Sequence, residues 1–156
     1  MLKPGDSAPD FFLSNTTGKK IKLSDYLGHK IALYFYPKDD TSGCTKQACS
    51  LRDGIAELVR NNIVVLGIST DDENSHRKFT AKYKLPFTLL CDIGAVVANK
   101  YGVWGIKKFL GKEFAGMIRT TFLINEKGKI VKIIEKPNTD DHAVEILSGF
   151  EAAGSP

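Results

Sequence analysis

The sequence predicts an α/β fold in which a central mixed sheet is flanked by helices. Four short runs, at 31–36, 63–69, 120–124 and 130–134, are almost continuously apolar, which is typical of strands covered on both faces. A segment with helical spacing of apolar residues separates the first two runs. A turn sequence separates the last two. Together these observations predict that parallel and antiparallel strands share one sheet.

The first forty residues carry weaker signals than the rest of the chain. Phe11–Leu13 and Lys20–Leu23 can pair as a small hairpin around 15–18, and a short helical turn near 24–27 can follow. We therefore expect a short N-terminal β extension ahead of the main sheet.

A helix is predicted over 44–61, between the first two apolar runs. Apolar or small residues recur there at helical spacing, namely at Ala48, Leu51, Ile55, Leu58 and Val59. A strand, a helix and a strand in this order form a right-handed crossover between parallel strands. A further helix is expected over 71–84, with Thr70 or Asp71 as its N-cap and Pro86 just beyond its end.

The last two apolar runs are joined by Asn125–Lys129, whose Gly128 suits a hairpin turn, so these strands are expected to pair antiparallel. A final helix is expected over 140–150, with Thr139 or Asp140 as its N-cap. The order βαβ, helix, ββα is the connectivity of a thioredoxin-like fold. The 156 residues suit a single domain, with 151–156 as a frayed tail.

Composition excludes several classes of protein. The net charge of +4 comes from Lys and Arg interspersed with Asp and Glu, which indicates a solvated surface and not a nucleic-acid site. No apolar run approaches the roughly 18 residues that a membrane span needs. Residues 1–10 lack the pattern of a signal or transit peptide. Three cysteines are too few, and odd in number, for a secreted disulfide scaffold, so we expect a reducing cytoplasm.

Cys44 stands where a loop is expected to become a helix. A thiol at a helix start lies among unpaired backbone N–H groups and at the positive end of the helix dipole, and both favour thiolate over thiol. Gly43 lets the backbone turn tightly there. Thr41 or Ser42 can cap the helix. This position indicates redox chemistry.

Cys44 shares a helical stripe with Ala48 and Leu51, so its sulfur is expected to point into the protein body. Plain core packing is the usual role of such a cysteine. Here the entry loop also contains Gly43 and Pro37, and a second cysteine follows at Cys49. This combination favours a redox role over packing alone.

Helical geometry constrains any bond between Cys44 and Cys49. Five helical residues correspond to a rotation of about 500° and a rise of about 7.5 Å, so the Cα atoms would lie roughly 8–9 Å apart. A disulfide normally needs a Cα separation of about 4.4–6.8 Å. Either Cys49 is inert, or the first turns of the helix unwind to make the bond. We favour unwinding.

The stretch YFYPKDDTSGCTKQAC at 34–49 resembles the active-site segment of peroxiredoxins. Its C-x-x-x-x-C spacing resembles the bacterioferritin comigratory protein (peroxiredoxin Q) branch in particular. Pro37, Thr41 and Cys44 match the family pattern Pro-x-x-x-Thr-x-x-Cys. Four further segments resemble the same branch: LKPGDSAPDF at 2–11, YGVWG at 101–105, GMIRTTFLI at 116–124 and PNTDDH at 137–142. The resemblance covers almost the whole chain.

The resemblance implies a thiol-dependent peroxidase of antioxidant defence that acts on hydrogen peroxide and organic hydroperoxides. Cys44 would attack the peroxide and become a sulfenic acid, which Cys49 would resolve as an intrachain disulfide. A thioredoxin-like dithiol would reduce that disulfide. Arg119 would hydrogen-bond the peroxide and stabilise developing charge. Thr41 would reach the thiolate or the peroxide, and Pro37 would wall the pocket.

Several other residues have weaker expectations. Gln47, one turn beyond Cys44, could hold hydrogen bonds of the pocket. Cys91 ends an apolar run and is expected to be a buried structural thiol, with a role as an alternative thiol partner as the other possibility. No metal, haem or flavin is expected for this chemistry. The three histidines, at no ligand spacing, are expected to be ordinary surface residues: His29, His76 and His142.

Two rival functions share parts of this pattern. A dithiol–disulfide oxidoreductase would have the same fold and a cysteine at a helix start, but its expected motif is C-x-x-C. A non-enzymatic thioredoxin-like binding module would not need the set Thr41, Cys44 and Cys49. The sequence therefore favours the peroxidase, which we expect to be a monomer with no nucleic-acid or membrane partner, because an intrachain resolving cysteine needs no second subunit.

Overall fold

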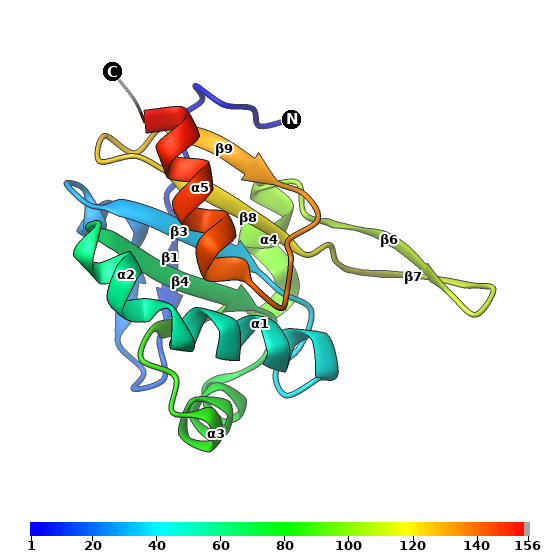
Figure 1. The fold of residues 1–156 in the computed structure, drawn as a ribbon. Coiled ribbons are helices and arrows are strands. Elements are labelled where there is room, and N and C mark those ends of the chain that lie inside the picture. The colour runs from blue at the N-terminus through cyan, green and yellow to red at the C-terminus, as the bar shows by residue number, and fades with distance from the viewer. Residues whose placement is uncertain (155–156) are drawn as a thin grey trace.

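A seven-stranded mixed sheet forms the centre of the computed structural model, which describes residues 1–154 (Figure 1). The strand order is β2-β1-β5-β4-β3-β8-β9. Strands β3, β4 and β5 are parallel, and β8 and β9 continue the sheet antiparallel. Their bounds are Lys30–Phe35, Ile63–Ser69, Thr88–Cys91, Thr120–Ile124 and Ile130–Ile134. This arrangement confirms the predicted α/β class and thioredoxin-like connectivity.

Helices cover both faces of the sheet. Figure 1 shows α1, α2 and α5 side by side across β3, β4 and β8. The α-helices are α1 (Ser42–Asp53), α2 (Ile55–Arg60), α3 (Glu73–Tyr83), α4 (Val96–Lys100) and α5 (His142–Gly154), and the 3₁₀ helices are η1 (Leu23–Tyr26) and η2 (Ile93–Ala95). Among residues 1–154, none of these helices is long and apolar enough to cross a membrane.

The N-terminal β extension is confirmed. Strands β1 (Phe12–Ser14) and β2 (Lys20–Lys22) form the expected hairpin, and η1 follows as the expected helical turn. The hairpin joins the main sheet where Ser14 pairs with Cys91 at the end of β5. The extension is therefore an edge of the central sheet.

Strand β3 separates two layers of core, and Tyr34 in the strand and Tyr36 just after its end lie in the layer that contains α1. Tyr34 and Tyr36 stack with ring centroids 5.2 Å apart, in the cluster that also buries Ala48 and Leu51 of α1. Phe35 points to the opposite face, as the alternation of a strand requires. The helix that carries Cys44 thus packs in the same core cluster as these two aromatic rings.

Three predicted helix boundaries differ from the structure. The helix expected over 44–61 is two helices that meet at Gly54, where an added Cβ would lie 2.4 Å from the Cβ of Ala143 in α5. Helix α3 is capped by Asp72, which accepts a hydrogen bond of 2.9 Å from the Ser75 N–H, and not by Thr70 or Asp71.

Helix α5 begins two residues later than expected and continues to Gly154, four residues into the segment expected to be a frayed tail. Residues 155 and 156 of that segment lie outside the described residues.

A two-stranded antiparallel ribbon was not foreseen from the sequence. Strands β6 (Trp104–Phe109) and β7 (Lys112–Met117) pair only with each other and form a second, separate sheet. Figure 1 shows this ribbon projecting from the body of the molecule, away from the central sheet. The ribbon ends two residues before Arg119.

Candidate active site

Cys44 lies in the first turn of α1, directly after the loop that leaves β3. The first hydrogen bond of the helix runs from the Thr45 N–H to the Thr41 carbonyl, at 2.8 Å. The backbone N–H of Cys44 is therefore among those left without a partner inside the helix. The side chain is 2% exposed and packs in the core beside Ala48 and Leu51, as the stripe predicted.

Arg119 lies far from Cys44 in the sequence but contacts it in the structure. Its Nη2 donates to Cys44 Sγ at 3.3 Å, and its Nη1 donates to Gln47 Oε1 at 2.6 Å. The cause is the pairing of β8 with β3, in which Thr120 lies opposite Phe35, so the residue before Thr120 arrives beside the entry to α1. A guanidinium at this place stabilises negative charge on the sulfur.

Gly43 and Gln47 shape the space around the guanidinium. A Cβ on Gly43 would lie 3.1 Å from Arg119 Nη2, so glycine leaves room for the close approach of the arginine, and a methyl group here would require the guanidinium to shift by a few tenths of an ångström. Gln47 is fully buried and uses its carbonyl oxygen to hold Arg119. Its Nε2 has no hydrogen-bond partner among the described residues. Gln47 therefore orients the arginine, as its spacing from Cys44 suggested.

Thr41 occupies the N-cap position, but its side chain does not cap the helix. Its hydroxyl donates to the Lys38 carbonyl at 2.9 Å. The proton of the hydroxyl is thus committed to the loop, while the lone pairs of the oxygen remain able to accept a hydrogen bond. Pro37 is half-buried in the same loop, two residues after Phe35, the last residue of β3.

Cys49 is half-buried and lies off the stripe of Cys44, within an unbroken α1. Cys44, Cys49 and Cys91 are all free thiols, so the structure shows the reduced chain with the helix folded. The next residue, Ser50, ties α1 to α5, because its hydroxyl accepts from the His142 N–H at 3.2 Å. The hydrogen bond that links α1 to α5 therefore lies immediately after the second cysteine.

The expectation that His76 and His142 lie on the surface is wrong, because both are fully buried; His29 is exposed as expected. His76 Nδ1 lies 2.6 Å from Asp39 Oδ2, and Nε2 lies 2.9 Å from the Leu90 carbonyl. Both partners accept, so both ring nitrogens donate and the ring is an imidazolium. Burial alone would lower the pKa of His76, but the hydrogen bond and charge of Asp39 outweigh it and raise the pKa.

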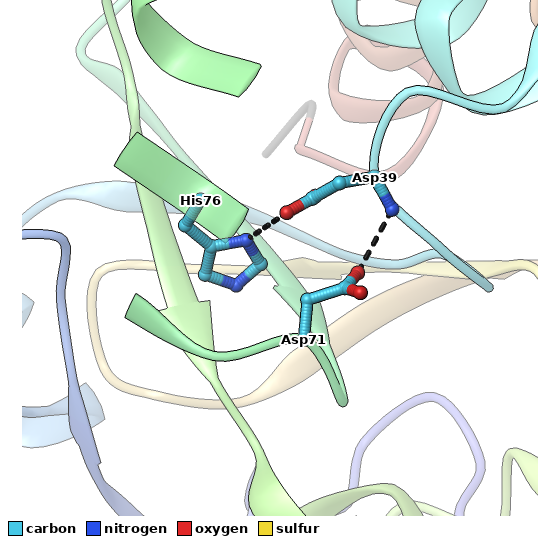
Figure 2. A group of neighbouring side chains, drawn as sticks. All are labelled: Asp39, Asp71 and His76. Atoms are coloured by element: carbon cyan, nitrogen blue, oxygen red, sulfur yellow. Dashed lines mark hydrogen bonds and ion pairs between the residues drawn. The ribbon is translucent and has the colours of Figure 1, made fainter. Parts of the chain in front are cut away.

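Asp39 anchors the loop before Cys44 onto α3 (Figure 2). Its carboxylate accepts hydrogen bonds from the Tyr36 hydroxyl, the Ser75 hydroxyl and His76, and its backbone N–H donates to Asp71 Oδ2 at 2.8 Å. The cluster of Asp39, Asp71 and His76 has the composition of a metal site. Both nitrogens of the imidazole and both oxygens of Asp39 are already hydrogen-bonded, so the cluster is a structural network.

Asp40 makes a second link between this loop and α3. Lys82 Nζ and the Tyr83 hydroxyl donate to its two carboxylate oxygens at 2.8 and 2.9 Å. The residue adopts a positive φ of 59°, which aspartate tolerates better than most side chains. The loop from β3 to α1 is thereby held on α3 at two consecutive residues.

His142 is a second buried histidine, between α5 and β8. Its Nδ1 lies 2.8 Å from Glu145 Oε1, and its Nε2 lies 2.8 Å from the Thr121 hydroxyl. Burial lowers the pKa of His142 more than Glu145 raises it, and the charge of Arg119 lowers it further. His142 is therefore neutral near pH 7, with Nδ1 as donor to the carboxylate and Nε2 as acceptor.

Cys91 belongs to a different part of the molecule from Cys44. It lines a cleft of about 670 Å³, whose other lining residues include Phe12, Arg77 and Val96 but neither Cys44 nor Arg119. Burial, followed by the negative charge of Glu73 and nearby aspartates, raises the pKa of Cys91 to about 11. A thiol that stays protonated is a poor nucleophile. This supports the expected structural role.

Comparisons with known proteins point to one family. A model of the AhpC/TSA family matches residues 4–133. The putative peroxiredoxin bcp of Buchnera aphidicola subsp. Schizaphis graminum is 50% identical over 147 residues, which are 94% of this chain and 93% of the relative. Peroxiredoxin Bcp of Bacillus subtilis is 44% identical over 146 residues, which are 94% of this chain and 93% of the relative.

Solved structures agree with these sequence relatives. Peroxidoxin BcpB of Mycobacterium tuberculosis superposes with a TM-score of 0.86 at 35% identity, over 99% of this chain and 100% of that one. The bacterioferritin comigratory protein of Xanthomonas campestris, studied for its alkyl peroxide reduction activity, superposes with a TM-score of 0.85 at 31% identity, over 91% and 90% of the two chains.

The replacement Gly43→Ala is expected to lower the reactivity of Cys44, because the added methyl group would displace Arg119 from the sulfur. We expect alkylation of Cys44 by iodoacetamide to slow by a factor of about ten, or about 1.4 kcal/mol. Mass spectrometry of the labelled peptide measures the rate. Ser42→Ala, at the neighbouring exposed position, is the matched control. Alanine has a higher helix propensity than glycine, so a slower rate could not be attributed to a weakened helix. An unchanged rate in Gly43→Ala would contradict this role of Arg119.

The replacement His76→Leu is expected to destabilise the protein in a pH-dependent way. The raised pKa of His76 means that its contribution is fully present below the unfolded value of about 6.5 and is lost as pH rises through the folded pKa. We expect a loss of about 1–3 kcal/mol in the free energy of unfolding at mildly acidic pH, shrinking at alkaline pH.

Urea unfolding of both proteins across this pH range measures the difference. His29→Leu, at an exposed histidine, is expected to change stability by no more than about 0.5 kcal/mol. A loss in His76→Leu that does not vary with pH would show that the imidazolium is not the stabilising form.

Proposed function

Because the chain belongs to the AhpC/TSA family of peroxiredoxins, in its bacterioferritin comigratory protein (peroxiredoxin Q) branch, we propose that it is a thiol peroxidase in which Cys44 attacks the peroxide. The observation that carries the proposal is the contact of 3.3 Å between Arg119 Nη2 and Cys44 Sγ at the start of a helix. Hydrogen peroxide and organic hydroperoxides are the proposed substrates, in line with the alkyl peroxide reduction studied in the Xanthomonas campestris relative.

In the first step the Cys44 thiolate attacks one oxygen of the peroxide. A sulfur–oxygen bond forms, the O–O bond breaks, and its electron pair leaves with the other oxygen as hydroxide or alkoxide. The sulfur is oxidised to sulfenic acid and the peroxide is reduced. Arg119 can donate N–H groups to the oxygens on which charge develops. Thr41 can accept the peroxide O–H, because its own proton is donated to Lys38.

In the second step the thiol of Cys49 condenses with the sulfenic acid of Cys44, forming a disulfide and releasing water. The folded α1 keeps the two Cα atoms roughly 8–9 Å apart, so the turns between them must open. Two anchors support this assignment. Asp39 and Asp40 hold the chain before the cysteines, and Ser50 holds it after them. The segment 41–49 lies between the anchors and is the part that would rearrange.

In the last step a thioredoxin-like dithiol reduces the disulfide and restores both thiols. None of the three steps requires a metal or an organic cofactor, and all can take place within one chain in the cytoplasm. The rival dithiol–disulfide oxidoreductase is less favoured, because four residues separate Cys44 from Cys49 and because Arg119 is aimed at the sulfur.

Mapping of disulfides by mass spectrometry after one equivalent of peroxide tests this chemistry. The unmodified chain is expected to contain a Cys44–Cys49 disulfide, with Cys91 still a thiol. Cys49→Ser is expected to stop at a sulfenic acid that dimedone traps. Cys44→Ser is expected to lose peroxide consumption with dithiothreitol by at least a factor of about 10³.

Full peroxidase activity in Cys44→Ser would refute the assignment of the attacking residue. A Cys44–Cys91 disulfide as the main product would refute the role of Cys49.

Oxidation is also expected to unwind the start of α1. Far-ultraviolet circular dichroism is expected to show a loss of helix, and amide hydrogen exchange over 44–51 is expected to rise. Cys49→Ser treated with the same peroxide is the control, because it cannot form the bond and is expected to keep the helix. An oxidised chain with an intact Cys44–Cys49 disulfide and unchanged exchange would contradict the opening.

A further inference from the structure

The ribbon of β6 and β7 exposes an unusual amount of apolar surface for its length. Four large apolar side chains of the ribbon lie open to solvent, and a fifth follows directly after it: Ile106, Phe109, Leu110 and Phe114, and then Ile118. Leu110, at the tip, is 86% exposed. Isolated exposed apolar residues are ordinary, but a cluster of them on one projecting element marks an interaction surface.

The two faces of the ribbon differ in charge. Lys107 lies opposite Phe114, and Phe109 lies opposite Lys112, so these four side chains share one face. We call this the aromatic–lysine face. It carries two positive charges and no acidic residue. On the other face Lys108 lies 3.5 Å from Glu113, so the charges there are balanced. The aromatic–lysine face is therefore suited to a partner with apolar and carboxylate groups.

The aromatic–lysine face continues into the catalytic site. Lys107 Nζ donates to the Met117 carbonyl at 2.8 Å, two residues before Arg119. An added Cβ on Gly105 would lie 2.9 Å from Ile118 Cδ1, so Ile118 packs across the base of this face. Burial lowers the pKa of Lys107, Arg119 lowers it further and Cys44 opposes the shift, which places all three groups in one electrostatic neighbourhood.

We propose that the aromatic–lysine face docks the protein dithiol that reduces the Cys44–Cys49 disulfide, through an apolar surface of that protein bearing carboxylates. This inference rests on the proposed function. A strand of six residues spans about 20 Å, which is longer than a small hydroperoxide but suited to a protein surface. Cys44 is nearly fully buried while α1 is folded, so a reductant must reach the disulfide while α1 is open, and a docking surface beside the site would hold it there.

The reduction transfers two electrons in two thiol–disulfide exchange steps, which pass through one mixed disulfide. One thiolate of the partner attacks a sulfur of the Cys44–Cys49 bond, forms a mixed disulfide and expels the other cysteine as thiolate. The second thiol of the partner then attacks the mixed disulfide. The partner leaves as an intramolecular disulfide, and both cysteines of the chain return to thiols. Docking beside Arg119 would hold the thiolate of the partner close to the disulfide that it attacks.

Steady-state turnover with two reductants tests the proposal. One assay uses thioredoxin with thioredoxin reductase and NADPH, and the other uses dithiothreitol, which needs no docking surface. For the double variant Phe109→Ser with Lys112→Glu we expect the KM for thioredoxin to rise by a factor of about ten or more. The rate with dithiothreitol is expected to stay within a factor of about two of the unmodified chain.

The matched control changes the other face of the same ribbon. Ile106→Ser with Lys108→Glu is expected to leave the KM for thioredoxin within a factor of about two. For the unmodified chain, the KM for thioredoxin is expected to rise with salt concentration, because the exposed Lys112 attracts carboxylates through solvent. This second measurement needs no variant.

Other outcomes would overturn the proposal. An unchanged KM in Phe109→Ser with Lys112→Glu would do so, as would turnover with dithiothreitol but none with thioredoxin. Loss of binding to vesicles of anionic phospholipid, or of a dimer in solution, with an unchanged KM would assign the face to a membrane or to a second copy. Absence of turnover with either reductant in the unmodified chain would instead refute the peroxidase function itself.

Discussion

The antiparallel pairing of β3 with β8 is the constraint on which the site depends. It sets Thr120 opposite Phe35 and so delivers Arg119 to a cysteine 75 residues earlier in the chain. Both strands are buried on both faces, so a shift of one residue in this register would exchange the side chains that the shifted strand directs into the two core layers. The core on either side of β3 therefore enforces the placement of the guanidinium. Gly43 and Gln47 then adjust that placement locally, by leaving room and by holding Nη1.

Around this pair two anchors hold the chain on either side of the short segment that carries both cysteines. The loop before Cys44 is held on α3 by two consecutive aspartates, and α1 is held on α5 from Ser50 onward. The buried His76 and His142 each take part in one of these anchors. They touch neither the sulfur nor Arg119 through any hydrogen bond described above, so we regard both as positioning residues. Their burial stabilises the anchors on both sides of the two cysteines.

The parts of the fold that could be predicted from sequence are those whose burial is complete. Strands covered on both faces read as unbroken apolar runs, and α1 reads as a stripe through Cys44, so both were identified. The ribbon was missed because no core covers it, and its strands therefore show no continuous apolar pattern. The expectation of a surface position for His76 rests on its polarity, whereas its spacing, three residues before the buried Phe79 on one face of α3, is typical of a buried residue. Arg119 could be connected with Cys44 only through the family resemblance, since strand register is invisible in a single sequence.

The continuous helix from Ser42 to Asp53 has an energetic consequence for the oxidised chain. A Cys44–Cys49 bond would be compatible only with an opened helix, so the free energy of helix folding and of reburying Cys44 would act against the bond. Because only the dithiol is compatible with a folded α1, refolding of the helix would favour the dithiol over the disulfide. Such a disulfide would be a stronger oxidant than one formed in an unstrained frame, and the next molecule of reductant would be consumed more readily. Folding of α1 would thus supply part of the free energy that returns the enzyme to its reduced state.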